Sequence, residues 1–256
     1  MNTIEAEVAA YNIPADKLDL DAIGPMLDGK DPAQIVAWSA AQFGDGLVMS
    51  SSFGAESALL IHMAIQAVPD IKIVFTDTGY LFPETFAFME QLRQRFKLNV
   101  WTYRTHNDPF AYLNAAGEKD PTWRENVDGC CAANKNEPFE RAMKELRPAA
   151  WLRGIRRNQA ETRAARQVIE WSKRYDCYAI SPLLSMTSKD IFAYMKRHDL
   201  PYHPLYEKGY ASIGCNPLSC TRPIMPGEDP RAGRWSGKNK LECGINVDNS
   251  LDSAQL

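Results

Sequence analysis

The chain has 256 residues and a net charge of −3, with 45% hydrophobic and 24% charged residues. This is the composition of an ordinary globular protein that buries a sizeable core, and its slight acidity argues against bulk binding to nucleic acid. No apolar run approaches the length of a membrane span, and the acidic residues that follow Met1 do not suit a signal peptide, so we expect a cytoplasmic protein with no membrane partner.

Apolar runs and helical patterns alternate along the first two hundred residues. Short apolar runs predict strands at 46–50, 71–75, 98–103, 149–152 and 177–180. Helical periodicity predicts helices at 55–67, about 83–96 and about 187–198, the last with a start that resembles a capping box. This alternation predicts right-handed βαβ units, and therefore an α/β fold with a Rossmann-like parallel sheet and helices on both faces.

The composition changes from about Leu205 onward. Prolines and glycines become frequent enough to break any long helix. We interpret residues 205–256 as an extended C-terminal arm that folds back over the sheet edge, and residues 1–204 as the α/β domain, with its sheet core at 30–204. A disordered tail is the alternative, but aromatic residues and cysteines speak against it at least as far as Cys243.

Five of the six cysteines stand where chemistry, more than packing, accounts for them. Cys130 and Cys131 are adjacent, where a mutual disulfide would be strained, and Cys215 and Cys220 flank a short loop. In a reducing compartment such clusters indicate metal binding or catalysis. The two pairs would suit an iron–sulfur cluster or zinc, which leaves Cys243 as a candidate nucleophile.

Polar loops follow the predicted strands at the edge where ligands of parallel sheets bind. The serine-containing loop 50–57 would suit a phosphate or sulfate, or could be an ordinary helix cap. Asp77, after the second strand, could bind a ribose or an adenine amine, or simply cap a turn. Arg231 and Arg234 on the arm could be brought over an anion bound by the loop after the fourth strand. Five arginines crowd that loop: Arg153, Arg156, Arg157, Arg163 and Arg166.

Taken together, these segments resemble the assimilatory sulfonucleotide reductases, and among them the cluster-bearing adenylyl-sulfate (APS) reductases. The similarity covers about residues 50–244 and follows the family's order: SSFGAES, DTGYLFPET, CC with Lys135 and Pro138, GIRRNQAETR, LPYHPLYEKGYASIGC, CTRP, GEDPRAGRW and ECG. The resemblance implies a sheet of the adenine nucleotide α-hydrolase-like (PP-loop) type. It also implies a role in sulfate assimilation and cysteine biosynthesis, and a homo-oligomer.

The resemblance also implies a role for each matching residue. Cys243 would attack the sulfate sulfur of APS, release AMP and carry a thiosulfonate, from which thioredoxin or glutaredoxin would release sulfite. Lys135 would link substrate and cluster electrostatically. The ligands of a [4Fe–4S] cluster would be Cys130, Cys131, Cys215 and Cys220. The substrate would be held by Ser51, Ser52, Phe53, Gly54, Glu56, Ser57, Asp77, Thr78, Gly79, Lys135, Gly154, Arg156, Arg163, Arg231, Arg234 and Asn246.

Two departures from the family pattern bear on these roles. Four residues separate Cys215 from Cys220 where the family has two, and Asn246 stands where the family has a histidine. Asn246 can still hydrogen-bond an anion, but it cannot carry charge. The altered loop keeps 3′-phosphoadenylyl sulfate (PAPS), alone or together with APS, as an alternative substrate.

Two other functions compete with this interpretation. A PP-loop ATPase would carry an SGGxDS-type loop, and SSFGAES lacks the double glycine. A metal-bound redox sensor that is not an enzyme would keep the paired cysteines, but it would have no need of Cys243 beside an arginine site.

Overall fold

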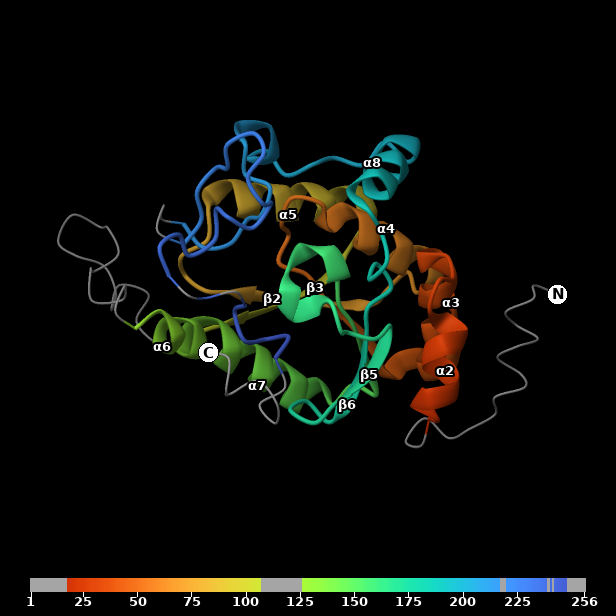
Figure 1. Cartoon of the computed structure of the whole chain (residues 1–256). Helices are drawn as coiled ribbons and strands as arrows, with labels where there is room; N and C mark the ends of the chain where they lie inside the picture. The colour runs from red at the N-terminus through yellow and green to blue at the C-terminus, as the bar shows by residue number, and fades with distance from the viewer. Residues whose placement is uncertain (1–17, 107–125, 217–219, 239, 241, 248–256) are drawn as a thin grey trace.

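The computed structural model describes residues 18–106, 126–216, 220–238, 240 and 242–247, and it contains a six-stranded sheet (Figure 1). The strand order is β3-β2-β1-β4-β6-β5. Five strands run parallel, and β5 at the edge pairs antiparallel with β6. The strands are β1 Leu47–Ser50, β2 Lys72–Asp77, β3 Asn99–Arg104, β4 Ala150–Leu152, β5 Ile169–Ser172 and β6 Cys177–Ile180. The α/β fold predicted from the sequence is confirmed, whereas β5 was not among the expected strands.

Helices cover both faces of this sheet. Helix α5 has the predicted bounds, and α4 and α8 begin within two residues of the predicted starts. Helices α2, α3, α6 and α7 were not among the expected helices, although α3 begins with a capping box in which Asp31 and Gln34 bond each other's backbone N–H groups. The helices are α2 Leu20–Leu27, α3 Pro32–Phe43, α4 Ser57–Ala67, α5 Pro83–Phe96, α6 Val127–Cys131, α7 Glu137–Leu146 and α8 Ser188–Arg197. None of the helices formed by the described residues has the length and apolar character needed to cross a bilayer.

Alternating side chains of the strands divide the core into two layers. In β1, Leu47 and Met49 join the larger cluster, which contains the buried residues of α2 to α5 and α8. Val48, between them, points to the smaller cluster formed with α7. The other central strands repeat this alternation, so the sheet is buried on both sides, as parallel sheets are. Figure 1 shows α6 and α7 on one side of the sheet and α2 to α5 on the other.

The chain beyond α8 folds back with little regular structure. It contains a 3₁₀ turn at Tyr206–Lys208 and two isolated bridges, Leu81 to Cys215 and Thr221 to Arg234. Leu205 and Ile213 pack with residues of the loops after β1 and β2. Figure 1 shows this segment, in blue, passing beside the loops at the strand ends toward α7. The arm therefore lies where ligands of this sheet would bind.

Candidate active site

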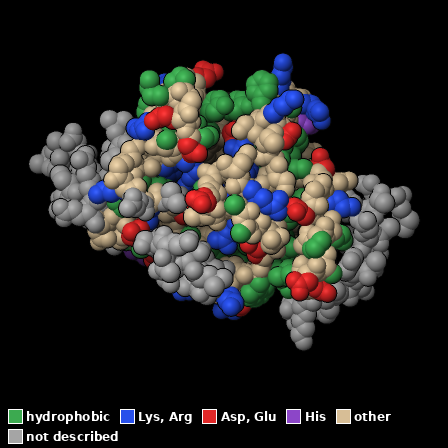
Figure 2. Space-filling model, viewed as in Figure 1, with side chains coloured by type: hydrophobic (Ala, Val, Ile, Leu, Met, Phe, Trp, Pro, Cys, Tyr) green, Lys and Arg blue, Asp and Glu red, His purple; other side chains and the backbone are tan. Residues whose placement is uncertain are grey.

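A cavity of about 260 Å³ opens where the strand order reverses, between β1 and β4. At such a switch point the loops that follow the two strands diverge and leave a crevice at their carboxyl ends. The loop 51–56 and the loop 153–159 form two of its walls, and the C-terminal arm adds a third. On the face shown in Figure 2, Lys and Arg side chains (blue) gather near the middle of the molecule with Asp and Glu side chains (red) among them.

The loop after β1 turns most of its polar groups toward this cavity. Ser51, Ser52, Gly54, Glu56 and Ser57 all line it. Phe53 does not, because its ring is fully buried against Phe75, with the two ring centroids 5.3 Å apart. Its φ of 47° lies in the left-handed region, which bulky residues rarely adopt. The buried ring thus anchors a bend whose neighbouring residues face the cavity.

Three residues of the loop after β2 were predicted to bind substrate, and of these three only Thr78 lines the cavity. The buried carboxylate of Asp77 accepts a hydrogen bond from the Gly79 N–H at 2.9 Å and pairs with Arg104 Nε at 2.6 Å. Asp77 and Gly79 do not line the cavity. The hydrogen bond between them caps the turn, which is the alternative role considered for Asp77 in the sequence analysis. Thr78 Oγ1 lies 3.2 Å from Cys215 Sγ and so connects this loop to the arm.

The arginines after β4 are paired within the protein. Arg153 is paired with Glu170, and Arg157 Nη2 lies 3.2 Å from Asp28. Arg156 Nη2 donates to Glu56 at 2.8 Å, but its buried Nη1 has no hydrogen-bond partner, which leaves a donor for a ligand at the cavity wall. Gly154, Arg156 and Arg163 line the cavity, as predicted for substrate residues. The charges of the arginines in this loop are thus offset by carboxylates at fixed positions within the protein.

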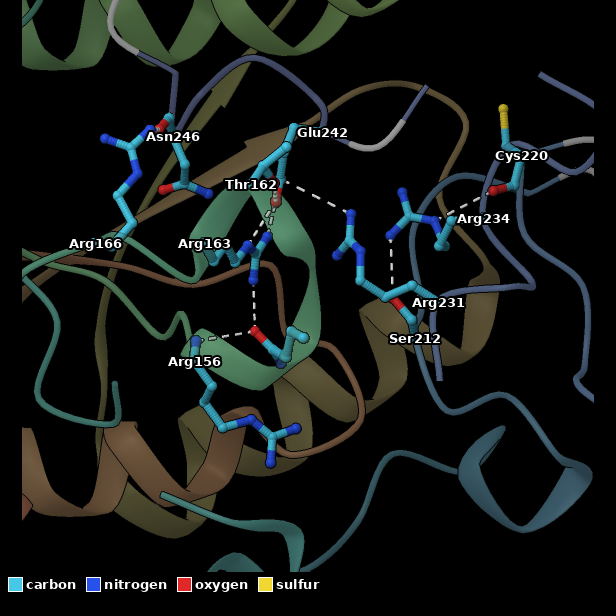
Figure 3. Close-up of polar contacts among 11 residues, drawn as sticks. Arg156, Thr162, Arg163, Arg166, Ser212, Cys220, Arg231, Arg234, Glu242 and Asn246 are labelled. Carbon is cyan, nitrogen blue, oxygen red and sulfur yellow. Dashed lines mark hydrogen bonds and ion pairs between the residues drawn. The ribbon is translucent and has the colours of Figure 1, made fainter. Parts of the chain in front are cut away.

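Glu242 approaches the cavity arginines from the arm (Figure 3). Its carboxylate forms two hydrogen bonds with Arg163, from Nε at 2.5 Å and from Nη2 at 2.9 Å, and lies 3.8 Å from Arg231. Burial alone would raise the pKa of Glu242, but the bonds and charges of these arginines hold it below its ordinary value. Burial lowers the pKa of Arg231 to about 10, so it remains a cation at neutral pH.

Cys243 lies at the boundary between two cavities. It lines the large cavity and also a small apolar one that contains the paired cysteines. Burial would raise the pKa of its thiol, but Lys135, a hydrogen bond from the Ile245 backbone N–H and Arg234 outweigh that effect and lower it. Because the thiolate is the nucleophilic form of cysteine, these neighbours favour reactivity at this sulfur.

The small cavity brings together the four cysteines predicted to bind metal. Cys130, Cys131, Cys215 and Cys220 all line it, together with Val127 and Trp235. All six cysteines of the chain lie in the described ranges, and none forms a disulfide. Burial and the nearby Cys215 raise the pKa of Cys131 to about 12, although Lys240 and Lys135 oppose this.

The donor chemistry of this cavity fits an iron–sulfur cluster. Within the described part of the chain, no three His, Cys, Asp or Glu side chains are arranged to hold a single metal ion. A [4Fe–4S] cluster does not require that arrangement, because its four thiolates bind different irons. Four thiols around one apolar space, those of Cys130 and Cys220 buried and those of Cys131 and Cys215 partly buried, with two lysines close by, match such a cluster in donor type and charge.

Hydrogen bonds also fix the chain that follows Cys243. Arg174 Nη1 donates to the Gly244 carbonyl at 2.5 Å and to the Val247 carbonyl at 3.4 Å. Tyr175 donates to the Ile245 carbonyl, and Arg166 donates to the Asn246 carbonyl. Asn246 lines the large cavity, and its buried Oδ1 has no hydrogen-bond partner.

Three of these contributors were missed by the sequence reasoning. Glu242 belongs to the ECG motif quoted above but carried no predicted role, and Arg174 and Tyr175 lie in an unpredicted turn between β5 and β6. A glutamate beside a candidate nucleophile in an arginine-rich chain was a usable signal for Glu242. The local sequence carries no signal for Arg174 or Tyr175, because their role depends on the position of the C-terminal arm in the folded chain.

Comparison with known proteins points to one family. Residues 46–223 match the family described as phosphoadenosine phosphosulfate reductase domain. A Xylella fastidiosa protein named phosphoadenosine 5′-phosphosulfate reductase is 40% identical over 230 residues, which cover 89% of this chain and 94% of the relative. A Halalkalibacterium halodurans protein named adenosine 5′-phosphosulfate reductase is 35% identical over 230 residues, which cover 90% of this chain and 97% of the relative.

Solved structures share the same architecture. A crystal structure of phosphoadenylyl-sulfate (PAPS) reductase from Candida auris, in a phosphate complex, has a TM-score of 0.65 at 26% identity, covering 77% of this chain and 93% of that one. FMN adenylyltransferase of Candida glabrata has a TM-score of 0.53 at 17% identity, covering 83% of this chain and 68% of that one, and shows likeness of fold alone. These likenesses confirm the predicted type of nucleotide-binding sheet.

Proposed function

The chain belongs to the phosphoadenosine phosphosulfate reductase family, enzymes that reduce sulfonucleotides in sulfate assimilation, and we propose that it reduces APS to sulfite and AMP through Cys243. The observation that carries this proposal is the position of Cys243. Its side chain lines both the arginine-bearing cavity and the four-cysteine cavity, beside Lys135. The candidate nucleophile therefore lies next to both the proposed anion site and the proposed cluster site.

The proposed reaction transfers the sulfonate group to the protein. The Cys243 thiolate attacks the sulfate sulfur, a sulfur–sulfur bond forms, and the bond between that sulfur and the bridging oxygen breaks, so AMP leaves with the electron pair. A dithiol reductant, thioredoxin or glutaredoxin, then attacks Cys243 Sγ and expels sulfite. The second thiol of the reductant resolves the mixed disulfide, which returns Cys243 to its reduced form and supplies the two electrons that take sulfate to sulfite.

Cations around the cavity would lower the barrier to this transfer. Thiolate and substrate are both negative, so their repulsion must be offset before the sulfur atoms approach. Lys135 and Arg234 already favour the Cys243 thiolate. Arg231 lines the same cavity and would stabilise the charge that moves onto the leaving AMP. Arg156 offers its unpartnered Nη1 to the nucleotide from the opposite wall.

The four-cysteine cavity would hold a [4Fe–4S] cluster through Cys130, Cys131, Cys215 and Cys220. When bound, the cluster would cross-link the arm to α6 and contribute to the local electrostatic field. Lys135 lines both cavities and would face the cluster on one side and the substrate on the other. The π-helical turn Ala132–Asn136, which carries Lys135 between α6 and α7, is a local distortion of a kind that often marks functional sites.

PAPS is the second candidate substrate. The relatives from Gloeobacter violaceus and Xylella fastidiosa are named for PAPS, whereas the relative from Halalkalibacterium halodurans is named for the nucleotide without the 3′-phosphate. The four-cysteine cavity supports APS for this chain, since it provides the ligand set of the cluster-bearing enzymes that the sequence resembles. A direct comparison of the two nucleotides is therefore part of the test.

Intact-protein mass spectrometry of the anaerobic holoenzyme, without a thiol reductant, tests the proposal. We expect incubation with APS to add one sulfonate group, located on Cys243 by peptide mapping, and we expect reduced thioredoxin to remove it as sulfite. An adduct from PAPS alone, or from both nucleotides, would keep the reaction but replace the proposed specificity. No adduct from either nucleotide on protein that retains iron and sulfide would refute the proposed function.

A further inference from the structure

Glu242 occupies the arginine site that the proposed substrate needs. All three nitrogens of the Arg163 guanidinium are engaged, because Nε and Nη2 donate to the Glu242 carboxylate and Nη1 donates to Gln159 Oε1 at 2.5 Å. The Thr162 hydroxyl adds a longer hydrogen bond to Glu242, at 3.4 Å. A second anion cannot bind the same face of Arg163 while this carboxylate remains there.

The contact is buried, so its charge matters. The Arg163 and Glu242 side chains are 9% and 6% exposed, and both line the large cavity. A buried ion pair is weakly screened by salt, and removing one partner leaves the other uncompensated. An incoming anion can replace the carboxylate without leaving Arg163 uncompensated, because the anion itself carries the negative charge that pairs with the guanidinium.

We propose that Glu242 is an internal anion that competes with the phosphosulfate of the substrate for Arg163 and Arg231. This inference rests on the proposed function and makes Glu242 a positioning residue. When the cavity is empty, Glu242 holds the segment that carries Cys243 over the cavity. When the nucleotide binds, its anion displaces the carboxylate and frees Glu242, the residue directly before Cys243.

The segment on the C-terminal side of Cys243 is held in a different way. Arg166, Arg174 and Tyr175 donate to backbone carbonyls there. None of these three side chains lines the large cavity, so a substrate anion bound there would not compete with the carbonyls for their donors. Gly244, at the junction, has a φ of 91°, and a Cβ at this position would collide with the Asn136 side chain. Substrate binding would therefore free the residue before Cys243 and leave the residues after it fixed, which keeps the sulfur near the cavity.

Binding measurements on Glu242→Gln test this competition. The substitution keeps the size of the side chain and removes its charge. Each protein also carries Cys243→Ser, so that no adduct forms, and isothermal titration measures the affinities of APS, PAPS and adenosine on holoenzyme. For each sulfonucleotide that binds the protein with Glu242 intact, whether or not it sulfonates Cys243, we expect Glu242→Gln to bind about tenfold more tightly, equivalent to ~1.4 kcal/mol. Adenosine, which has no anion to compete, should bind both proteins equally.

Glu228→Gln provides the matched control. Glu228 also lies on the arm and pairs with an arginine, Arg222, at 3.0 Å, but it does not line the large cavity. We expect it to leave all three affinities unchanged. Unchanged or weaker binding of the sulfonucleotide to Glu242→Gln would overturn the competition, and so would an equal gain for adenosine.

Alkylation of Cys243 gives a second readout that needs no nucleotide. With Cys243 present, Glu242→Gln should increase the rate of its carboxamidomethylation several-fold relative to the wild type and Glu228→Gln, measured by peptide mass spectrometry on the alkaline plateau of the rate. There the thiol is fully ionised, so removing the Glu242 charge, a charge that raises the pKa of Cys243, does not contribute. An unchanged rate would show that Glu242 does not hold the segment in place. Both readouts are separate from the adduct assay, so the inference can fail while the adduct still forms, and the proposed function can fail while Glu242 still competes with an anion.

Discussion

The sheet half of the molecule and the arm that follows it are held in place by different kinds of contact. In the sheet half, ladders of backbone hydrogen bonds join five parallel strands, and side chains such as Phe75 and Leu152 are fully buried between layers. In the arm, backbone hydrogen bonds are scattered, such as that from the Trp235 N–H to the Cys220 carbonyl at 3.2 Å, and long side chains add further bonds, as Arg234 Nε does with the Cys220 carbonyl at 3.2 Å. From the sheet half, Arg174 Nη1 binds the Gly244 carbonyl at 2.5 Å. Continuous ladders therefore fix one region, whereas isolated hydrogen bonds, several of them from cations, fix the other.

This difference would allow one chain to combine the proposed nucleotide site, on a rigid sheet, with a segment around Cys243 that can move. Segments with few buried apolar contacts open locally at a small cost in free energy, whereas a core opens only when the whole domain unfolds. Of the cations that position the segment around Cys243, Arg163 lines the large cavity, so a substrate anion could change its partner, whereas Arg174 does not line it. We infer that the sheet half fixes the position of the nucleotide and that movement of the arm controls when the Cys243 thiol reacts.

Replacing the candidate nucleophile Cys243 gives the largest expected effect. Cys243→Ser should reduce sulfonate transfer by on the order of 10³-fold or more, because a serine hydroxyl is a poor nucleophile without a general base. Its free energy of unfolding should change by less than about 0.5 kcal/mol, because the arm contributes little to the core. The adduct assay and urea unfolding measure the two quantities.

Cys177→Ser is the reciprocal variant in the sheet half. Cys177 is fully buried in β6 within the apolar cluster of Phe139 and Trp151. A hydroxyl placed there should cost about 1–3 kcal/mol of unfolding free energy, while sulfonate transfer to Cys243 should stay within twofold of the wild type. If Cys177→Ser lost the transfer, or if Cys243→Ser destabilised the domain as much, the separation between the two regions would be wrong.

The regular elements of the sheet half could be predicted because their signals are local. Helix α5 has the predicted bounds because Pro83 opens it and its apolar pattern runs to Phe96. β6 was predicted as an apolar run, whereas β5 was missed because only Ile169 and Ser172 of its four residues are buried. α3 was missed even though its start carries a readable capping box.

The site was predictable only in part. The pairing of the cysteines predicted that they would lie together, and they line one cavity. The contact of Glu242 with Arg163 joins residues 79 apart in the chain, and no local pattern encodes such a distance. The family resemblance assigned Phe53 and Asp77 to substrate binding through the loops SSFGAES and DTG, but their side chains pack or pair away from the cavity. Whether a loop residue faces a cavity depends on tertiary packing.

The junction between the two regions should make stability depend on pH through His203. This fully buried histidine accepts a hydrogen bond from the Leu205 N–H at Nδ1, and its Nε2 lies 3.1 Å from Thr85 Oγ1, an arrangement that suits a neutral ring. Burial lowers its pKa to about 4. Between pH 6.5 and 4 the unfolded chain therefore binds a proton that the folded chain does not, so stability should fall as the pH falls.

Urea unfolding at several pH values measures this effect. As the pH falls from 6.5 to 4, the contribution of His203 to the free energy of unfolding should decrease by up to about 1.4 kcal/mol per pH unit. Above pH 6.5 this contribution should be fully present. His203→Gln should lower stability at pH 7.5 but remove that part of the pH dependence. Equal slopes for His203→Gln and the wild type would show that the junction does not titrate in this way.

The cap of α8 should give the smallest effect and one confined to the sheet half. Thr187 Oγ1 accepts a hydrogen bond from the Asp190 N–H at 3.2 Å, and Asp190 Oδ2 accepts one from the Thr187 N–H at 2.8 Å, which completes the capping box expected from the sequence. Thr187→Ala should therefore cost about 1 kcal/mol in urea unfolding, while Thr187→Ser, which keeps the acceptor, should cost less. Because the cap lies in α8 and not in the segment around Cys243, neither variant should change the alkylation rate of Cys243. A faster alkylation in Thr187→Ala alone would mean that the arm responds to small losses of stability in the sheet half, and the two regions would then be one cooperative unit.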